Sequence, residues 1–232
     1  MKYEPSATTP SASSASTRRR WLGALLAAVA VASGCGGGDP VAGVGTGGTG
    51  AFAVGPITGL GSIVVNGVRY DDSGATVVDA DGRASVVGTG ANPLAVGMVV
   101  EVSGRVDDGG ATGTATRVVH AAEIKGPVTA VDAAAGTFDV FGLRVRTNAA
   151  TVYADFAGVA ALAAGHVVEV YGLPDPGGRV LATRVERKAT SVAAYAASGG
   201  VFRLRGTAQA VAGSGAALRF SVVGVAVATD AS

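Results

Sequence analysis

The sequence predicts an all-β protein: small five-stranded barrels in tandem, of the oligonucleotide/oligosaccharide-binding (OB) type, after a signal peptide and a glycine-rich tether. Three observations predict it. Valine-rich segments are punctuated by glycine, as is typical of short strands and tight turns. Matching blocks recur in the same order about 70 residues apart. No segment after Cys35 has the run of about 18 apolar residues that a membrane-spanning helix needs.

The first element is an export signal. Arg18, Arg19 and Arg20 form a positive region, and residues 21–32 form an apolar run of the length typical of export signals and too short to span a membrane. Small residues then lead into Cys35, which is the only cysteine of the chain. A lone cysteine in an exported protein has no partner for a disulfide within its own chain, so we expect another use for this thiol.

The segment V-A-S-G-C at residues 31–35 resembles the lipobox of bacterial lipoproteins, in which the cysteine is acylated and becomes the first mature residue. The resemblance implies a signal peptide at 1–34 and a membrane anchor at Cys35. The segment T-R-R-R-W-L at 17–22 also resembles a twin-arginine export signal, and an ordinary Sec-type signal is the alternative. Gly36 resembles the pattern that sorts such proteins to the outer membrane. We therefore expect a lipid-anchored protein of the cell envelope, facing the periplasm or the surface.

The second element, residues 35–54, is rich in glycine and is expected to be a flexible tether. The net charge of the chain after residue 34 indicates which classes of partner to expect. Residues 1–34 contain four basic side chains and one acidic side chain, so the remainder has 14 basic and 16 acidic residues, a net charge of −2. Nucleic-acid-binding proteins normally carry a clear basic excess, and we therefore expect no nucleic-acid partner.

The remaining elements are repeats. Five blocks match between the first and second copies, and two of them recur in a third. The opening block is G-P-I-T at Gly55, G-P-V-T at Gly126 and G-T-A-Q at Gly206. The next is S-I-V-V-N-G-V-R at 62–69, T-F-D-V-F-G-L-R at 137–144 and R-F-S-V-V-G-V-A at 219–226. The third block is A-T-V-V in the first copy and A-T-V-Y in the second. The fourth block is L-A-V-G-M-V-V-E-V-S-G in the first copy and L-A-A-G-H-V-V-E-V-Y-G in the second. The fifth block is T-A-T-R-V in the first copy and L-A-T-R-V in the second.

These blocks resemble the bacterial family catalogued as domain of unknown function 5666, which occurs in tandem in exported proteins and lipoproteins. The resemblance covers about residues 55–232 and implies no catalytic residues. It divides the chain into repeat 1 at 55–125, repeat 2 at 126–190 and a truncated repeat 3 at 191–232. The strands of the third copy cannot close a core alone, so we expect either that the gene is cut short or that these strands pair with the second barrel or with another chain.

Within each complete copy the pattern reads as five short strands around one buried face, which favours an OB-like barrel; a small two-sheet sandwich is the alternative. Phe138, Val140 and Val145 are expected to face inward, with Gly142 at a turn or bulge. Val168 and Val170 are expected on one face of their strand, and Glu169 and Tyr171 on the other. A hairpin connects this strand to the next across residues 173–178.

If that hairpin is centred between Pro176 and Gly177, Glu169 falls opposite Arg184. The first copy offers the same pair, Glu101 and Arg117. We predict that both are exposed cross-strand ion pairs that set the register of the strands and contribute about 0–1 kcal/mol each.

The sequence offers no constellation for catalysis, cofactor binding or metal binding. His120 and His166 fall at unmatched places in the two copies, and we expect both to be incidental surface or edge residues. The segment D-A-D-G at Asp79 resembles a fragment of a calcium loop but lacks the further carboxylate, so a turn between strands is the expected structure. No G-x-S-x-G motif occurs.

We therefore expect a protein that binds a partner or acts as a structural spacer, and not an enzyme. Recognition of polysaccharide or peptidoglycan is the alternative, and a protein partner in the envelope is also open. Glycan recognition would need exposed aromatic side chains, for which Tyr70, Tyr153 and Tyr171 are the candidates. Alternate arginines at Arg144/Arg146 and at 203/205 could bind an anionic glycan, although a solvated strand face is the expected role.

Overall fold

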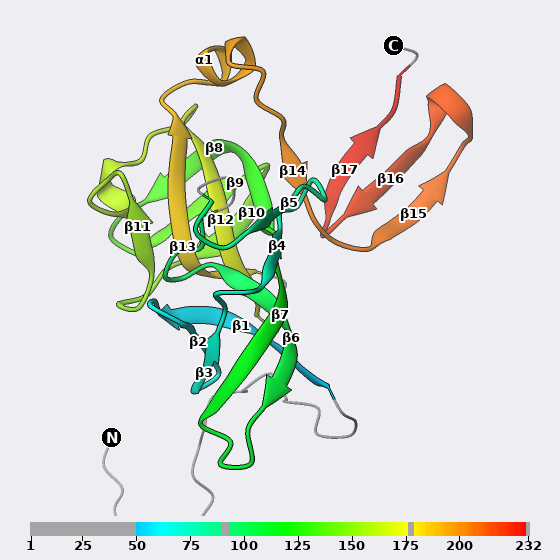
Figure 1. Ribbon diagram of the computed structural model, residues 1–232. Coiled ribbons are helices and arrows are strands. Elements are labelled where there is room, and N and C mark those ends of the chain that lie inside the picture. The colour runs from blue at the N-terminus through cyan, green and yellow to red at the C-terminus, as the bar shows by residue number, and fades with distance from the viewer. Residues whose placement is uncertain (1–49, 90–92, 176–178, 231–232) are drawn as a thin grey trace, which may run out of the picture. The chain divides into compact units, whose positions relative to one another are not determined.

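The computed structural model describes residues 50–89, 93–175 and 179–230. Cys35 and its neighbours lie outside these residues, so the signal peptide and the lipid anchor stay predictions. The described residues form two seven-stranded sheets and one three-stranded sheet, as the sequence predicted for an all-β protein (Figure 1). No helix among them has the length and apolar character to cross a membrane.

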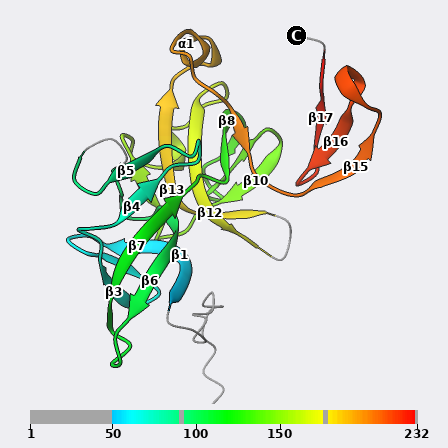
Figure 2. The same ribbon diagram turned by 45° about the vertical axis from the view of Figure 1, so that its right-hand side comes forward.

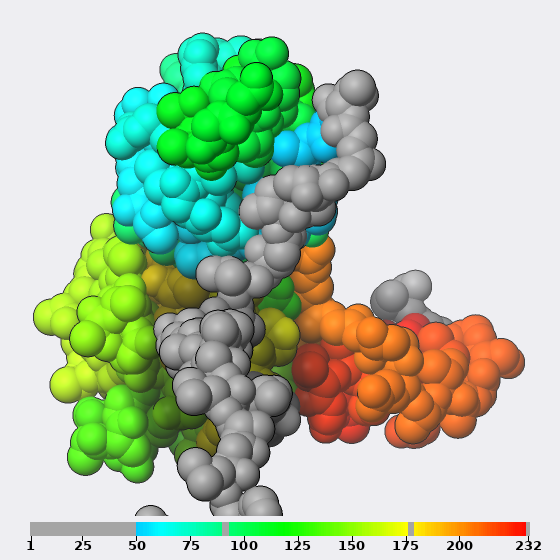
Figure 3. Space-filling model, turned by 90° about the horizontal axis from the view of Figure 1, so that it is seen from below, coloured from blue at the N-terminus to red at the C-terminus, as the bar shows by residue number. Residues whose placement is uncertain are grey.

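The first sheet closes on itself to form a barrel. Its strands are β1 (Ala51–Gly59), β2 (Ile63–Val65), β3 (Val68–Asp71), β4 (Thr76–Val78), β5 (Ala84–Val86), β6 (Val99–Val106) and β7 (Thr112–His120). The order β3-β2-β1-β6-β7 becomes a ring because β3 runs parallel to β7, with Tyr70 opposite Gly113. β4 also runs parallel to β7, and β5 pairs with β4 outside the ring. The barrel fills one rounded region of the surface, coloured cyan to green in Figure 3.

The β2–β3 hairpin shows how the barrel is built from its sequence. Its turn is Asn66-Gly67, with φ of 52° and 79°, the pair of positive angles that suits the twist of a two-residue hairpin. The Asn66 side chain donates a hydrogen bond to the carbonyl of Val54 on β1, at 2.9 Å. The inward side chains of the hairpin are at most 6% exposed: Ile63, Val65, Val68 and Tyr70.

The second sheet repeats this architecture. Its strands are β8 (Ile124–Asp132), β9 (Thr137–Val140), β10 (Leu143–Arg146), β11 (Val152–Ala154), β12 (Val167–Pro174) and β13 (Val180–Ala189), with a 3₁₀ turn, η1 (Val159–Ala161), before β12. β10 runs parallel to β13 and closes a second five-stranded ring, visible in Figures 1 and 2. The predicted tandem of OB-like barrels is confirmed.

The predicted core of the second barrel is also confirmed. Phe138, Val140 and Val145 are at most 1% exposed. Gly142, which the sequence placed at a turn or a bulge, lies in a two-residue turn with Phe141, with φ of 81° and 54°. This block therefore forms two strands, β9 and β10, that pair with each other around the turn, and the A-T-V block pairs outside the ring as β4 or β11.

Two expectations about strand boundaries and exposure are wrong. β1 begins at Ala51, inside the range expected to be tether, because its first residues pair with the end of β6. On β12, Val168 and Val170 face the core as predicted, but Glu169 and Tyr171 on the outer face are also buried, at 7% and 3% exposed. Other segments cover this outer face, so it is not the solvated surface that the alternation suggested.

The predicted register of the β12–β13 hairpin is wrong by two residues. Glu169 lies opposite Glu186, and Arg184 lies opposite Tyr171. One residue of the offset is already present beside the loop, where Pro174 pairs with Val180. The second comes from a β-bulge between Tyr171 and Gly172.

The first barrel shows the same correction. Glu101 lies opposite Val119, Arg117 lies opposite Ser103, and a bulge falls between Ser103 and Gly104. Neither predicted pair is therefore directly cross-strand. In both barrels one residue of the offset is present beside the loop, where Val106 pairs with Gly113 in the first, and the bulge at equivalent glycines adds the other.

Residues after the second barrel form a short helix and a third sheet. They comprise α1 (Val192–Ala197), β14 (Arg203–Leu204), β15 (Ala208–Ala212), η2 (Gly215–Ala217), β16 (Arg219–Val222) and β17 (Val225–Ala228). The Ser191 hydroxyl caps α1 by accepting a hydrogen bond from the Ala194 N–H, at 3.1 Å. β14 pairs with β8 of the second barrel, whereas β15, β16 and β17 pair with one another. Part of the third copy thus pairs with the second barrel, which was one of the expected arrangements.

Candidate functional site

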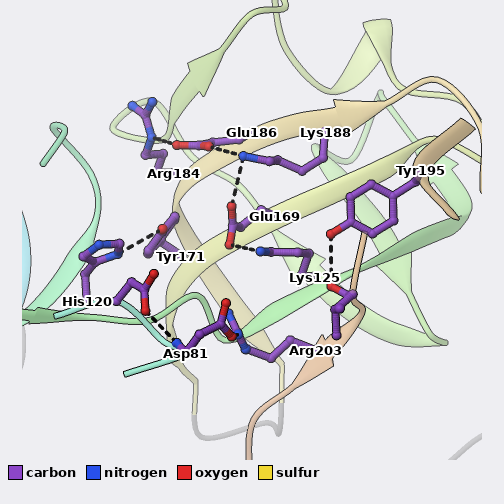
Figure 4. Close-up of polar contacts among 12 residues, drawn as sticks. Asp81, His120, Lys125, Glu169, Tyr171, Arg184, Glu186, Lys188, Tyr195 and Arg203 are labelled. Atoms are coloured by element: carbon purple, nitrogen blue, oxygen red, sulfur yellow. Dashed lines mark hydrogen bonds and ion pairs between the residues drawn. The ribbon is translucent and has the colours of Figure 1, made fainter. Parts of the chain in front are cut away.

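The outer face of the second barrel carries a charged cleft of about 580 Å³. Its floor is formed by neighbouring strands β8, β12 and β13, whose side chains Lys125, Glu169 and Glu186 line it. The turn between β4 and β5 contributes Asp79 and Asp81. Figure 4 shows the polar contacts among side chains in and around this cleft.

Glu169 is the centre of the charged cluster. It lies opposite Lys125 on β8 and opposite Glu186 on β13. Lys125 Nζ is 3.0 Å from Glu169 Oε1. Lys188 Nζ is 3.3 Å from Glu169 Oε2 and 3.3 Å from Glu186 Oε2 (Figure 4). Lys188 therefore bridges two carboxylates that face each other across the ladder, which offsets a repulsion between like charges.

Arg184 extends the cluster along β13. Because side chains two apart share a face of a strand, Arg184, Glu186 and Lys188 all point into the cleft. Arg184 Nε donates a hydrogen bond to Glu186 Oε1 at 2.6 Å, and its Nη1 donates to the carbonyl of Val96 at 3.1 Å. The five charges form one chain of alternating sign: Lys125, Glu169, Lys188, Glu186 and Arg184.

These ion pairs shift the pKa values of Glu186 and Lys188. Burial raises the pKa of Glu186, but the hydrogen bond from Arg184 and the charges of Lys188 and Arg184 outweigh burial and hold it below its usual value. Burial lowers the pKa of Lys188, but the charges of Glu169 and Glu186 outweigh burial and raise it. Both groups are thus held in their charged forms near neutral pH.

His120 and Tyr171 meet at the other side of the cleft. Tyr171 Oη lies 3.4 Å from His120 Nδ1 (Figure 4). Burial lowers the pKa of His120 and raises that of Tyr171, so both are neutral near pH 7. His120 Nε2 is buried without a hydrogen-bond partner among the described residues. His120 is half-buried at the end of β7 and contacts Tyr171, so of the expected surface or edge position it occupies the edge. His166 accepts a hydrogen bond from the N–H of Ala163 in its own loop.

Side-chain hydrogen bonds to backbone carbonyls join the two barrels beside the cleft. The Thr183 hydroxyl donates to the carbonyl of Gly97 at 2.6 Å. A Cβ at Gly97 would come within 2.6 Å of the Thr183 carbonyl, and its φ is +87°, so this position requires glycine on both counts. Tyr171 packs into the hydrophobic cluster of the first barrel although its chain belongs to the second.

The model of the domain of unknown function 5666 (DUF5666) matches the chain twice, over residues 54–119 and 125–186. The chain belongs to this family. Each match falls on one of the two closed barrels, so the DUF5666 repeat corresponds to one OB-like barrel in this protein. Residues 191–232 lie outside both matches. No curated protein and no solved structure matches the chain.

The two DUF5666 repeats place the four residues of the predicted ion pairs differently. Glu169 and Arg184 share the buried face of repeat 2 but bind other partners. Glu101 is instead 3.7 Å from Arg205, and Arg117 is exposed on β7. Sequence analysis missed the charged cluster in repeat 2 because the outer face of β12 was expected to be solvated. The available signal was the alternation of charge along β13, at Arg184, Glu186 and Lys188.

The D-A-D-G segment that begins at Asp79 lies between β4 and β5 of the first DUF5666 repeat. Asp79 Oδ1 accepts hydrogen bonds from the N–H groups of Asp81 and Arg83, which closes a turn between β4 and β5. A turn was the expected structure of this D-A-D-G segment. Arg203 of β14 forms an ion pair with Asp81, so the strand after repeat 2 also contacts the turn of repeat 1.

Two of the three tyrosines that were candidates for glycan recognition are buried. Tyr70 is 0% exposed inside the first barrel, and Tyr171 is 3% exposed. Tyr153 stacks edge to face on Phe156, with centroids 5.3 Å apart. Arg144 is exposed and forms an ion pair with Asp139. Arg146 is also exposed, and its Nη1 lies 3.6 Å from Asp175 Oδ2. Both arginines therefore lie on a solvated strand face, as we expected.

Proposed function

We propose that this chain is a lipid-anchored protein of the bacterial cell envelope whose two DUF5666 barrels bind a partner or act as a spacer, without catalysing a reaction. The segment V-A-S-G-C at 31–35 carries the proposal, because it follows an arginine cluster and an apolar run. Each buried acyl methylene contributes about 0.8 kcal/mol, so several chains on Cys35 would hold the protein on a bilayer.

The chemistry of the cleft supports binding over proton transfer. A general acid or base works best with a pKa near the working pH, and it must be free to exchange its proton. The carboxylates of Glu169 and Glu186 are instead held by lysine and arginine at 2.6 to 3.3 Å. A set of charges held in ion pairs offers fixed hydrogen-bond donors and acceptors to a polar ligand.

Recognition of envelope polysaccharide or peptidoglycan is the second candidate. The volume of the cleft, about 580 Å³, is within the range of small-ligand sites. Because Tyr70 and Tyr171 are buried, sugar would be held by hydrogen bonds to the charged cluster and not by stacking. Retention on purified peptidoglycan that is lost in Glu186→Gln would support this candidate, and no retention at high protein concentration would remove it.

The anchor is tested by fractionating cells. We expect the wild-type chain in the membrane fraction, and Cys35→Ser in the soluble fraction or with its leader retained, because serine cannot form the thioether to the lipid. Ser33→Ala is the matched control, since it keeps a small residue beside the motif and leaves the thiol in place. Release of both variants in equal amounts from the membrane would contradict anchoring through Cys35.

A further inference from the structure

A row of four charged side chains crosses the floor of the cleft from strand to strand. Arg203 on β14 lies opposite Lys125 on β8. Lys125 lies opposite Glu169 on β12, which in turn lies opposite Glu186 on β13. Residues directly opposite one another share a face of the sheet, with Cβ atoms about 4.5 to 5.5 Å apart. The row therefore begins with two positive charges side by side, an arrangement that is unfavourable without an anion.

Among the described residues, each of these two cations pairs with one carboxylate and keeps further donors. Lys125 Nζ lies 3.0 Å from Glu169 Oε1, and Arg203 Nη2 donates a hydrogen bond to Asp81 Oδ1 (Figure 4). A lysine ammonium has three N–H donors and a guanidinium has five, so both groups can donate to another acceptor. The side chains of Lys125 and Arg203 are 18% and 22% exposed, which leaves both within reach of a molecule in the cleft.

The side chains that line the cleft carry one positive charge in excess. The alternating chain of five charges, taken with Asp79, Asp81, Arg83 and Arg203, comprises five positive and four negative side chains. His120 also lines the cleft and is neutral near pH 7, because burial lowers its pKa. One monovalent anion would make the site neutral. A phosphate ester, with a charge of about −1.5 to −2, would instead leave it negative.

The floor of the cleft presents side chains to a ligand and not a free strand edge. At Lys125, β8 is paired with β14 on one side and with β12 on the other. β12 is paired in turn with β13. A peptide that binds by strand addition needs an unpaired backbone edge, which the described residues of β8 and β12 do not leave here. Sugar hydroxyls can bond to the fixed charges of the row without such an edge.

We propose that Lys125 and Arg203 form a carboxylate-binding subsite, and that the ligand of the cleft is an acidic saccharide whose sugar ring carries a carboxylate. The proposal rests on the glycan-binding candidate above and names the chemical class of its ligand. The carboxylate would accept hydrogen bonds from both cations and so remove the repulsion between them. Arg203 lies outside both DUF5666 matches, so the strand after the second repeat would supply half of the subsite.

The probes are monosaccharides that differ only at their last carbon: glucose, glucuronate and glucose 6-phosphate, with the corresponding galactose series. They are titrated into the isotope-labelled full chain and followed by nuclear magnetic resonance. We expect at least one uronate to shift amide signals of β8 and β14 saturably. It should bind at least about tenfold more tightly than its neutral counterpart, and also more tightly than its phosphorylated one.

The outcomes separate this proposal from the glycan candidate. Equal binding of a uronate and its neutral sugar would overturn the carboxylate subsite and support glycan binding. Tighter binding of the sugar phosphate would overturn the carboxylate as the recognised group. No binding of either uronate would also overturn the subsite, and retention on peptidoglycan then decides the glycan candidate separately.

The two partners of one ion pair give opposite expectations. Arg203→Gln removes a donor to the carboxylate and should weaken uronate binding at least about tenfold. Asp81→Asn removes the carboxylate that competes for Arg203, so uronate binding should tighten by about twofold or more. An ion pair that only maintains the shape of the cleft would shift binding in the same direction in both variants, and that result would overturn the proposal.

Arg205→Gln is the matched control for the loss of a positive charge. Arg205 follows Arg203 by two residues, but it lies 3.7 Å from Glu101 and does not line the cleft. Its substitution should change uronate binding by less than about twofold. A loss equal to that of Arg203→Gln would indicate a general effect of charge and overturn the assignment to this subsite.

A peptide carboxylate is tested with N-acetyl-trialanine, whose carboxyl terminus is free. We expect it to bind the full chain more weakly than the uronate, because it lacks the hydroxyl groups that would bond to the row of charges. Tighter binding of this peptide at β8 and β14 would assign the cleft to a peptide and overturn the saccharide.

Discussion

Glu169 pairs with two lysines from different strands, Lys125 on β8 and Lys188 on β13 (Figure 4). It is also one of the three polar or charged residues that are buried among the described residues. Its equivalent in the first barrel, Glu101, is far more exposed and pairs only at 3.7 Å with Arg205. The two repeats therefore offer a buried glutamate and an exposed one at the same position of the fold.

This contrast yields the first prediction. Glu169→Gln keeps the shape but leaves two lysines without their counter-charge, and it should lower the free energy of unfolding by roughly 2 to 3 kcal/mol. Glu101→Gln should lower it by less than about 1 kcal/mol, because exposed ion pairs contribute little. Urea denaturation of both variants measures the difference. Equal losses would contradict the structural importance assigned to the cluster.

The second prediction concerns pH. The pKa of His120 lies below its usual value of 6.5 because the ring is buried, although Asp79, Glu169 and Glu186 oppose this shift and Arg203 adds to it. As the pH falls below about 6.5, the unfolded chain binds a proton at this histidine before the folded chain does. Stability should therefore fall between about pH 7 and pH 5, above the range in which the paired carboxylates titrate.

The urea midpoint at pH 7.5 and at pH 5.5 measures this effect. His120→Asn should reduce the difference between the two values, because the group that takes up the proton is gone. His166→Asn, the matched control, should keep the wild-type difference. A full wild-type difference in His120→Asn would show that other groups control the acid response.

At the scale of elements, the strands were predictable from their periodicity and the register was not. Phe138, Val140 and Val145 alternate with polar residues, and that alternation placed them correctly in the core. Register depends on how many residues the loop and the bulges take up, and the alternation carries no such count. Gly104 and Gly172 were the available signal, since glycine inside a strand often marks a bulge.

The third prediction follows from this bulge. A Cβ at Gly104 would lie 2.0 Å from the carbonyl oxygen of Thr114, so the paired backbones would have to move apart. Gly104→Ala should lower the free energy of unfolding by about 1 to 3 kcal/mol. Gly109 in the adjacent hairpin loop has open space around it, and Gly109→Ala should have an effect below about 0.5 kcal/mol. Thermal unfolding of the two variants compares them, and similar losses would contradict the close approach at the bulge.

At the scale of the whole molecule, the tandem of barrels was predictable and the cleft beside them was not. The repeated blocks and the family resemblance predicted the two closed barrels. The contacts that cover the outer face of β12 join residues distant in sequence, such as Thr183 to Gly97 and Arg203 to Asp81. Such pairs leave no periodic trace in a single sequence, so Glu169 and Tyr171 looked solvated until the fold placed other segments over them.

The proposed function depends on a lipid at Cys35 that would hold the two barrels to a membrane outside the cytosol. Mass spectrometry of the protein purified from cells tests this most directly. We expect the mature chain to begin at Cys35, with a diacylglyceryl group on its sulfur and residues 1–34 removed. A mature chain that keeps residues 1–34, or that begins elsewhere with an unmodified thiol, would contradict the account.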